Sequence, residues 1–428
     1  MTVSEEPNLE RAGADWPPAV IAGAWRTGVL GMRSLARRGV RAACFDCNRS
    51  YEGFRSIYGR AYECPDPDAD PRGWVAFMIE LSGLMGGKPV LVASADQFVS
   101  AIAAHASALG GHYVLSPGAE LHGALANKQT QYELAARHGM PMPRTRCVTS
   151  IRDITTFARD ARFPCLLKPT HFREWQRLPT NHPFFDTKVA IAQSADELVS
   201  NWGLVEEATP NVVAQEIILG PDGSKRVYMS CYGREGRRIG NALFRPLRCD
   251  PVGFGPATIS EPVEDPEADE ACDHFLRSLG YSGICEIEVK RDERDGRVKL
   301  IEVNPRLSGN GDAAPHAGVD LCWLYYLDAI GREVRPVAPS RRQFRHVVLR
   351  SDLGAIIRYR RERLVSWADV IRSYKPPLAF FDLDARDWRY SAETVYRMLR
   401  AAVRELVHWM FPRARHGQPP DPVNQKIV

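Results

Sequence analysis

The sequence lacks the features that would place the chain in or across a membrane. No apolar run reaches the roughly 18 residues that a membrane-spanning helix needs. The opening segment, MTVSEEPNLERAGAD, is acidic and has no apolar core of the kind found in a secretory signal peptide. We therefore expect a cytoplasmic protein, and we expect its residues 1–16 to be disordered.

The ten cysteines do not form a pattern typical of a metal site. Cys44 and Cys47 make one CxxC, with no second pair and no histidine at zinc spacing. A thioredoxin-like redox role is the alternative for this CxxC. Buried, reduced thiols are the favoured interpretation for a cytosolic protein.

The glycines near the N-terminus do not match a dinucleotide-binding loop. Gly23, Gly28 and Gly31 do not form GxGxxG, in which the first glycine pair shapes the turn around a pyrophosphate. The turn after Gly23 could still bind an anion at the start of the following helix. No Ser–His–Asp or Cys–His arrangement requires a covalent nucleophile.

Charge is nearly balanced over the 428 residues but is unevenly distributed. The net charge is +4, whereas residues 331–428 carry 20 Lys+Arg against 10 Asp+Glu. Such a basic region could meet an anionic substrate, nucleic acid or a membrane surface. No block of Lys and Arg with interleaved aromatic residues is present, so a solvated surface is favoured and no nucleic-acid partner is expected.

Short apolar segments alternate with helical segments through the first quarter of the chain. The buried strands are expected at Ala19–Gly23, Arg41–Phe45 and Pro89–Ala93. This alternation predicts an α/β fold with a parallel sheet and helices on both of its faces. The expected domains are 17–115, 120–335 and a basic C-terminal region at 336–428.

Two later strands carry most of the chemical information. Cys285–Lys290 and Leu300–Arg306 are joined by a segment containing Asp295-Gly296, a strong hairpin signal. Because side chains alternate along a strand, Glu286 shares a face with Glu288, and Glu302 shares one with Asn304. Buried carboxylates need a partner or a metal, and oxygen ligands of this kind suit Mg²⁺. The alternative is a surface hairpin with its polar face in water.

Two lysines precede this hairpin in unusual settings. Lys128 begins a helix expected at 127–138, and Lys168 lies inside the apolar strand PCLLKP. A lysine in a buried strand is costly unless its ammonium meets an anion, and a triphosphate is such an anion. The alternative for each lysine is a side chain that extends to solvent.

Taken in order, these motifs resemble the ATP-grasp superfamily. The matching segments are NKQTQYELAARHGMPMPRT at 127–145, PCLLKP at 164–169, VVAQEIILGPD at 212–222 and CEIEVK…LIEVNPRLSG at 285–309. The first 115 residues fit the Rossmann-like domain that precedes the ATP-grasp fold, whose two α+β subdomains grip a nucleotide. FRSIYG at 54–59 and RCDPVGFG at 248–255 resemble the D-aspartate-ligase-like group of carboxylate–amine ligases.

The resemblance implies an ATP site built from several motifs. Lys128 and Lys168 would contact the α- and β-phosphates. The hinge between the subdomains would meet adenine and ribose, and the residues expected there are Gln215, Glu216, Ile218 and Asp222. The segment 171–188, where many family members have a glycine-rich loop, contains no glycine. Its Lys188 is expected to be a third phosphate-facing cation.

The resemblance also implies a metal site and a catalytic pair. Glu288 and Glu302 would hold Mg²⁺ or Mn²⁺ with help from Asn304, and Glu286 is the alternate ligand. Arg306 would stabilise the transferring phosphoryl group or the acyl-phosphate. Arg248 would clamp a substrate carboxylate in a bidentate manner, which Arg does better than Lys.

The implied activity is ATP-dependent amide formation from a small carboxylate and an amine through an acyl-phosphate. The alternative is a non-catalytic ATP-binding protein of the same fold. A homodimer is expected only because many relatives are dimers. A helix expected at about 392–411 carries an apolar stripe, formed by Val395, Leu399, Val403, Leu406 and Met410. That stripe is typical of a core or a dimer interface, and contact with an anionic membrane surface is the alternative.

Overall fold

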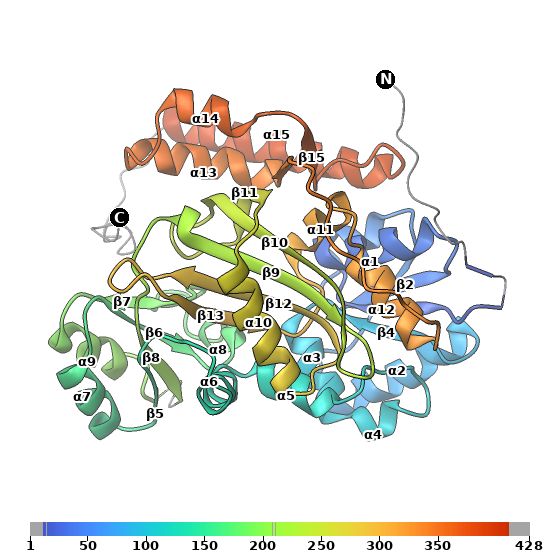
Figure 1. Ribbon diagram of the computed structural model, residues 1–428, viewed down its shortest axis with the longest axis horizontal. Coiled ribbons are helices and arrows are strands. Elements are labelled where there is room, and N and C mark those ends of the chain that lie inside the picture. The colour runs from blue at the N-terminus through green and yellow to red at the C-terminus, as the bar shows by residue number, and fades with distance from the viewer. Residues whose placement is uncertain (1–11, 14, 208, 210, 411–428) are drawn as a thin grey trace.

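The computed structural model describes residues 12–13, 15–207, 209 and 211–410 (Figure 1). It contains three β-sheets. In Figure 1 the largest sheet lies between the N-terminal unit and the unit that contains β5–β8, and α13–α15 lie along one side of it. No helix among the described residues is long and apolar enough to cross a membrane.

The N-terminal unit contains a parallel four-stranded sheet in the order β3-β2-β1-β4. Its strands are β1 (Ala19–Ala22), β2 (Ala42–Asp46), β3 (Arg60–Glu63) and β4 (Val90–Ala93). Its helices are α1 (Arg26–Ala36), η1 (Glu52–Arg55), α2 (Pro71–Met85), α3 (Asp96–Ala104) and α4 (Ala106–Leu109). Alternate residues of β1 join two different apolar cores, one with α1 and the other with α2 and α3. Helices therefore cover both faces, which confirms the expected Rossmann-like domain.

The second unit is an antiparallel sheet in the order β5-β8-β6-β7. Its strands are β5 (Thr145–Val148), β6 (Cys165–Pro169), β7 (Ala190–Ala192) and β8 (Val212–Glu216). The helices before and within it are α5 (Ala119–Ala126), α6 (Lys128–Arg137), α7 (Ile151–Asp160), α8 (Phe172–Gln176) and α9 (Ala195–Gly203). Ile154 and Phe157 of α7 pack with Leu198 and Trp202 of α9 on one face of the sheet.

The third unit is a seven-stranded sheet in the order β13-β12-β9-β10-β11-β14-β15. Its first five strands in the chain are β9 (Lys225–Tyr232), β10 (Arg238–Cys249), β11 (Ala257–Pro262), β12 (Gly283–Arg291) and β13 (Val298–Asn304). The associated helices are η2 (Asp222–Ser224), α10 (Pro266–Ser278), η3 (Gly309–Asp312), α11 (Ala313–His316) and α12 (Leu321–Ala329). One face packs on α12 and α1 of the N-terminal unit, and the other packs on α10 and α6.

The C-terminal region does not form a separate appended unit. β14 (Arg345–Val347) pairs antiparallel with β11, and β15 (Leu378–Phe380) pairs parallel with β14. The region also contains α13 (Leu349–Arg361), α14 (Trp367–Ser373) and α15 (Trp388–Met410). A boundary at residue 336 therefore divides a continuous sheet. The two strands were missed because three-residue strands are too short to show alternation.

Two expectations from the sequence concern the ends of the chain, namely disorder in residues 1–16 and an apolar stripe on the last helix. Trp16 lies within the segment expected to be disordered, yet it stacks on Trp323 and Tyr326 with ring centroids 6.0 and 6.2 Å apart. Residues 1–11 and 14 lie outside the described residues. In α15, Val395 and Leu399 are exposed. The other three members of the apolar stripe have side chains outside the described part of the structure.

Candidate active site

The hairpin β12–β13 places its polar side chains as the alternation predicts. Glu286 lies opposite Asn304 and Glu288 lies opposite Glu302 in the antiparallel register. Gly296 in the connecting turn has φ +70°, a conformation that favours glycine. Glu286 and Asn304 are 4% and 6% exposed, so this face is not in water. The surface-hairpin alternative is therefore wrong.

Lys128 and Glu302 form an ion pair that joins two parts of the chain far apart in sequence. The Asn127 side chain accepts the backbone N–H groups of Gln129 and Thr130, which fixes Lys128 as the first residue of α6. Partial burial opposes ionisation of Glu302, but its cationic neighbours lower its pKa to about 2. Those neighbours are Lys128, Lys188 and Lys168, in decreasing order of effect. The three lysines expected to face phosphate thus all act on one carboxylate.

Lys168 is buried in β6 and does not extend to solvent. Its Nζ donates to the Tyr132 hydroxyl at 2.6 Å and to Gln215 Oε1 at 3.0 Å. The ammonium also lies 4.6 Å from the Tyr132 ring centroid. Burial lowers the pKa of Lys168 to about 8, against an opposing effect of Glu302. Both partners are neutral, so no carboxylate bonds directly to this cation.

Tyr132 is a site residue that the sequence did not reveal. Its hydroxyl donates a hydrogen bond to the Ile301 carbonyl at 2.5 Å and accepts one from Lys168 Nζ. It therefore couples β6 to the strand that carries Glu302. The one available signal was a tyrosine on the buried face of the helix that Lys128 begins.

The expected hinge residues follow β8 and keep mostly internal partners. The Gln215 amide donates to Thr145 Oγ1 at 2.8 Å, and Glu216 Oε1 accepts the Arg162 backbone N–H at 2.9 Å. Ile218 is buried beyond the end of the strand. Asp222 has partners from later parts of the chain, because its Oδ2 accepts from the Gly253 N–H and from the Tyr359 hydroxyl of α13. Contacts of these four residues with adenine and ribose stay predictions.

Arg306 is held by residues from two units. Its Nε and Nη2 donate to the two carboxylate oxygens of Asp96 at 2.5 and 3.0 Å, and Nη2 also reaches Asn304 Oδ1 at 3.2 Å. Asp96 is the first residue of α3, directly beyond β4 of the parallel sheet. Ligand sites commonly lie at the carboxyl ends of parallel strands. The position of Asp96 just after β4 was therefore a signal in the sequence that the analysis of motifs did not use.

The donor set next to Glu302 fits a divalent cation in part. Glu302 and Asn304 share a face and carry hard oxygen atoms, as Mg²⁺ prefers when phosphate completes its shell. Glu288 is instead paired with Lys225, Nζ to Oε2 being 2.6 Å. Within the described part of the chain, no group of three or more His, Cys, Asp or Glu side chains is placed to hold a metal.

The alternate ligand, Glu286, lies deeper in the same face. It accepts from the Asn304 amide at 3.3 Å and from the Ser308 hydroxyl. Burial, and then the negative charge of Glu288, raise the pKa of Glu286 to about 7. By accepting these two hydrogen bonds, Glu286 orients Asn304 and the segment after Arg306. Its contacts in this structure are therefore structural.

Arg248 does not lie where a substrate clamp was expected. It is 2% exposed and makes a bidentate ion pair with Asp352 of α13, while its Nη1 donates to Ser373 Oγ at 2.8 Å. The guanidinium clamps a carboxylate of the chain itself. The sequence suggested a substrate carboxylate as the bidentate partner, whereas the partner in the structure is Asp352 of the C-terminal region.

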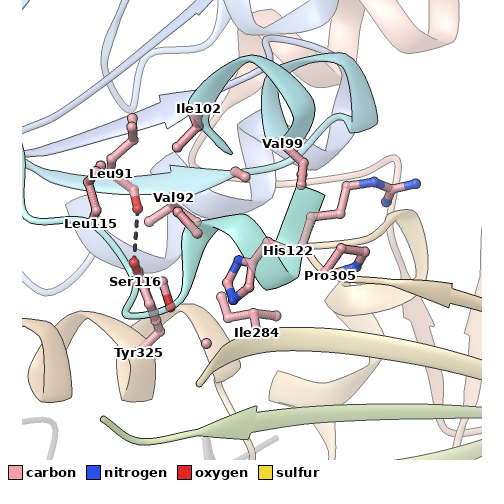
Figure 2. Close-up of a pocket in the computed structure, with 14 residues that line it drawn as sticks. Leu91, Val92, Val99, Ile102, Leu115, Ser116, His122, Ile284, Pro305 and Tyr325 are labelled. Atoms are coloured by element: carbon pink, nitrogen blue, oxygen red, sulfur yellow. Dashed lines mark hydrogen bonds between the residues drawn. The ribbon is translucent and has the colours of Figure 1, made fainter. Parts of the chain in front are cut away.

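A mostly apolar cavity lies beside Arg306, between β4, α3 and the start of β12 (Figure 2). Val92, Val99, Leu115, Ile284 and Pro305 supply much of its wall. Two of its polar side chains already have backbone partners, since the Tyr325 hydroxyl donates to the Leu91 carbonyl at 3.1 Å and His122 Nε2 lies 2.7 Å from the Ser282 carbonyl. This lining does not suit a triphosphate, which needs cations and donors.

One part of this site matches a known family in sequence, and solved structures share the fold. Residues 255–351, which include the hairpin and Arg306, match the family described as ATP-grasp in the biosynthetic pathway with Ter operon. An N5-carboxyaminoimidazole ribonucleotide synthetase in complex with ADP has the same fold. It is 12% identical with a TM-score of 0.60, covering 81% of this chain and 86% of that one. The chain has the ATP-grasp fold, and its residues 255–351 match an ATP-grasp family.

Two further similar proteins are amino-acid ligases by name. The D-aspartate ligase of Enterococcus faecium (strain Aus0004) is 26% identical over 229 residues, which is 51% of this chain and 53% of that protein. The chain thus matches about half the length of this curated relative. The L-amino acid ligase of Bacillus licheniformis is 16% identical with a TM-score of 0.56, covering 75% of this chain and 78% of that one.

Proposed function

We propose that the protein is an ATP-dependent carboxylate–amine ligase that forms an amide bond through an acyl-phosphate. The observation that carries the proposal is the ion pair between Lys128 and Glu302, with the charges of Lys188 and Lys168 also lowering the pKa of that carboxylate. Cations around one ionised carboxylate suit a triphosphate with its divalent ion. The names of the two ligase relatives favour an amino acid or another small carboxylate as the substrate.

The lysines and the hairpin would share the work of binding nucleotide. Lys128 is paired with Glu302 in this structure and can turn from it to a phosphate, because both side chains are partly exposed. Lys168 is held by Tyr132 and Gln215, so it offers a fixed charge. A divalent ion, when bound by Glu302 and Asn304, would neutralise charge on the phosphate oxygens.

Arg306 would act on the reacting groups. A substrate carboxylate oxygen forms a bond to the γ-phosphorus while the bond to the bridging oxygen breaks, and ADP leaves with that electron pair. An amine nitrogen then bonds to the acyl carbon, phosphate leaves with the electron pair of the broken C–O bond, and the nitrogen gives up a proton to solvent. Asp96 and Asn304 fix the guanidinium beside the hairpin, where it can stabilise charge on the phosphoryl oxygens.

The test is release of ADP and phosphate with Mg-ATP in the presence of pooled carboxylic acids and pooled amines. The wild type is expected to release both products only when a carboxylate and an amine are present together. In Glu302→Ala this release is expected to fall at least 100-fold. Glu80→Ala serves as the matched control, because Glu80 is an exposed carboxylate on α2. Tight ATP binding without release from any pool would favour the non-catalytic alternative. Absence of ATP binding would contradict the proposal.

A further inference from the structure

The two cysteines of the CxxC segment lie on opposite faces of the parallel sheet. Cys44 is part of β2 and is buried in the apolar core shared with α1, whereas Cys47 and Cys64 pack into the core shared with α2 and α3. Because successive side chains of a strand point to alternate faces, residues three positions apart diverge. Cys44 and Cys47 therefore cannot approach each other as the two thiols of a thioredoxin-like motif do.

Cys47 instead lies beside Cys64, which directly follows β3. The parallel register of β2 and β3 ends with Asp46 opposite Glu63, and the Cys64 N–H donates to the Asp46 carbonyl at 3.1 Å. The two cysteines are thus neighbours just beyond the ladder, and their Sγ atoms are 3.6 Å apart. Neighbouring strands lie about 4.8 Å apart, and a disulfide needs Cα atoms about 4.4–6.8 Å apart. The backbone therefore already has a spacing that suits a disulfide.

The two thiols differ in exposure and in protonation. Cys47 is partly exposed and is followed by the exposed residues 48–50, whereas Cys64 is 6% exposed. The hydrogen bond between the two sulfurs, and then burial, raise the pKa of Cys64. Cys64 therefore keeps its proton, and Cys47 is the thiol that an oxidant in solvent reaches first. A reacting thiol beside a second thiol that can displace its oxidised form is the arrangement of a redox-sensitive pair.

Two carboxylates just beyond Cys64 hold the segment that follows β6. Arg173 donates to the two oxygens of Asp66 at 2.6 and 3.2 Å and to Asp68 at 2.9 Å, and Arg177 donates to Asp68 at 3.0 Å. The four side chains are between 31% and 64% exposed, so each ion pair alone contributes little. The hold on this segment therefore depends on how firmly the loop that begins at Cys64 is fixed to the sheet.

We propose that Cys47 and Cys64 form a reversible disulfide under a peroxide, and that this bond fastens the Asp66–Asp68 loop, with the segment it holds, to the parallel sheet. The Cys47 sulfur bonds to one peroxide oxygen, the O–O bond breaks, and the other oxygen leaves as water with the thiol proton. The Cys64 sulfur then bonds to the Cys47 sulfur, the S–O bond breaks, and a second water leaves with the Cys64 proton. A dithiol reductant reverses the reaction. The inference does not depend on the proposed function.

Mass spectrometry of the full-length wild-type protein tests the bond without any variant. The reduced protein is treated with hydrogen peroxide, free thiols are alkylated, and a tryptic digest is analysed without reductant. Peptide 42–49 contains both Cys44 and Cys47, and peptide 61–72 contains Cys64. We expect the two peptides to be linked, with fragment ions that place the bond at Cys47, and to separate after treatment with dithiothreitol. A bond within peptide 42–49, a link through Cys44, or no link would overturn the inference.

Substitutions separate the roles of the two thiols. In Cys64→Ser, Cys47 should be left as a sulfenic acid that dimedone traps, formed at a rate within two-fold of wild-type thiol loss. In Cys47→Ser, oxidation of Cys64 should be at least ten-fold slower, because Cys64 is buried. Cys147→Ser is the matched control, since Cys147 is another partly exposed thiol, and it should leave the link unchanged. Equal rates in Cys64→Ser and Cys47→Ser would contradict the assigned order of reaction.

Hydrogen–deuterium exchange tests the fastening of the loop. In the wild type, peroxide should slow exchange of the amides in 171–188 at least three-fold, and dithiothreitol should restore the original rate. The same peroxide treatment should leave this exchange unchanged in Cys47→Ser, which controls for oxidation at other residues. In Asp66→Asn/Asp68→Asn the disulfide should still form without slowing exchange, because the carboxylates that hold the two arginines are gone. A wild-type disulfide with no change in exchange would overturn the fastening. Neither measurement uses ATP, so failure of the proposed function leaves both outcomes readable.

Discussion

Arg248 and Asp352 form a bidentate ion pair with both side chains buried. Nε donates to Oδ1 at 2.9 Å and Nη2 donates to Oδ2 at 2.7 Å. Thr258 Oγ1 donates to the same carboxylate at 2.6 Å, and so does the Tyr374 hydroxyl. The network joins β10 and β11 to α13 and to the segment after α14. It therefore ties the C-terminal region to the central sheet.

Removing one member of this pair is expected to destabilise the protein strongly. Arg248→Met leaves the Asp352 carboxylate buried without its cation, which typically costs about 3–5 kcal/mol. Denaturant unfolding monitored by circular dichroism would measure the loss. Arg248→Met/Asp352→Leu removes both charges and should recover most of it. A raised KM for a carboxylate substrate with unchanged stability would instead support the substrate clamp that the sequence suggested.

Lys168 should make nucleotide binding depend on pH. Its pKa of about 8 means that the free protein loses this positive charge as the pH rises through 8. A bound phosphate favours the ammonium and raises that pKa, so ADP affinity should fall about ten-fold between pH 7 and pH 9. Calorimetry at the two pH values measures the change. In Lys168→Met the fall should be much smaller, and an equal fall would assign the titration to another group.

The same lysine predicts a pH-dependent contribution to stability. The folded pKa of about 8 lies below the ordinary value of 10.5, so between these values the unfolded chain binds more protons. Stability relative to Lys168→Met should therefore rise with pH across this window, by at most about 3 kcal/mol, and stay constant below it. Parallel urea titrations of the two proteins at pH 7, 9 and 10 would show the difference. A decrease over this range would contradict the lowered pKa.

Much of the hairpin could be predicted from sequence because the signals are local. Alternation along a strand decides which face Glu286 and Glu288 share, and a helix cap decides where Lys128 lies. The partners of these groups could not be predicted in the same way. Asp96 and Arg306 are 210 residues apart, and Arg248 and Asp352 are 104 apart. Such pairs depend on how whole units pack, which no local pattern encodes.

Tyr132→Phe isolates the hydroxyl that couples Lys168 to β13. Its loss removes two buried hydrogen bonds and should cost about 1–2 kcal/mol of stability. ADP affinity should fall several-fold, because Lys168 keeps only Gln215 as a hydrogen-bond partner. Tyr113→Phe is the matched control, since its hydroxyl donates to the Met78 carbonyl at 2.7 Å in the N-terminal unit. It should lower stability without an effect on ADP affinity, and equal effects on affinity would remove Tyr132 from the site.

Asp96→Asn tests whether the N-terminal unit positions Arg306. The substitution keeps the shape of the side chain but removes the charge that holds the guanidinium in two hydrogen bonds. If Arg306 acts on the transferring phosphoryl group, turnover should fall about ten-fold while ADP affinity changes less than two-fold. Asp70→Asn is the matched control, because Asp70 caps α2 in the same unit through the Gly73 N–H. That variant should leave turnover unchanged. A parallel fall in ADP affinity and turnover in Asp96→Asn would mean that the pair closes the units around nucleotide rather than aligning a catalytic group.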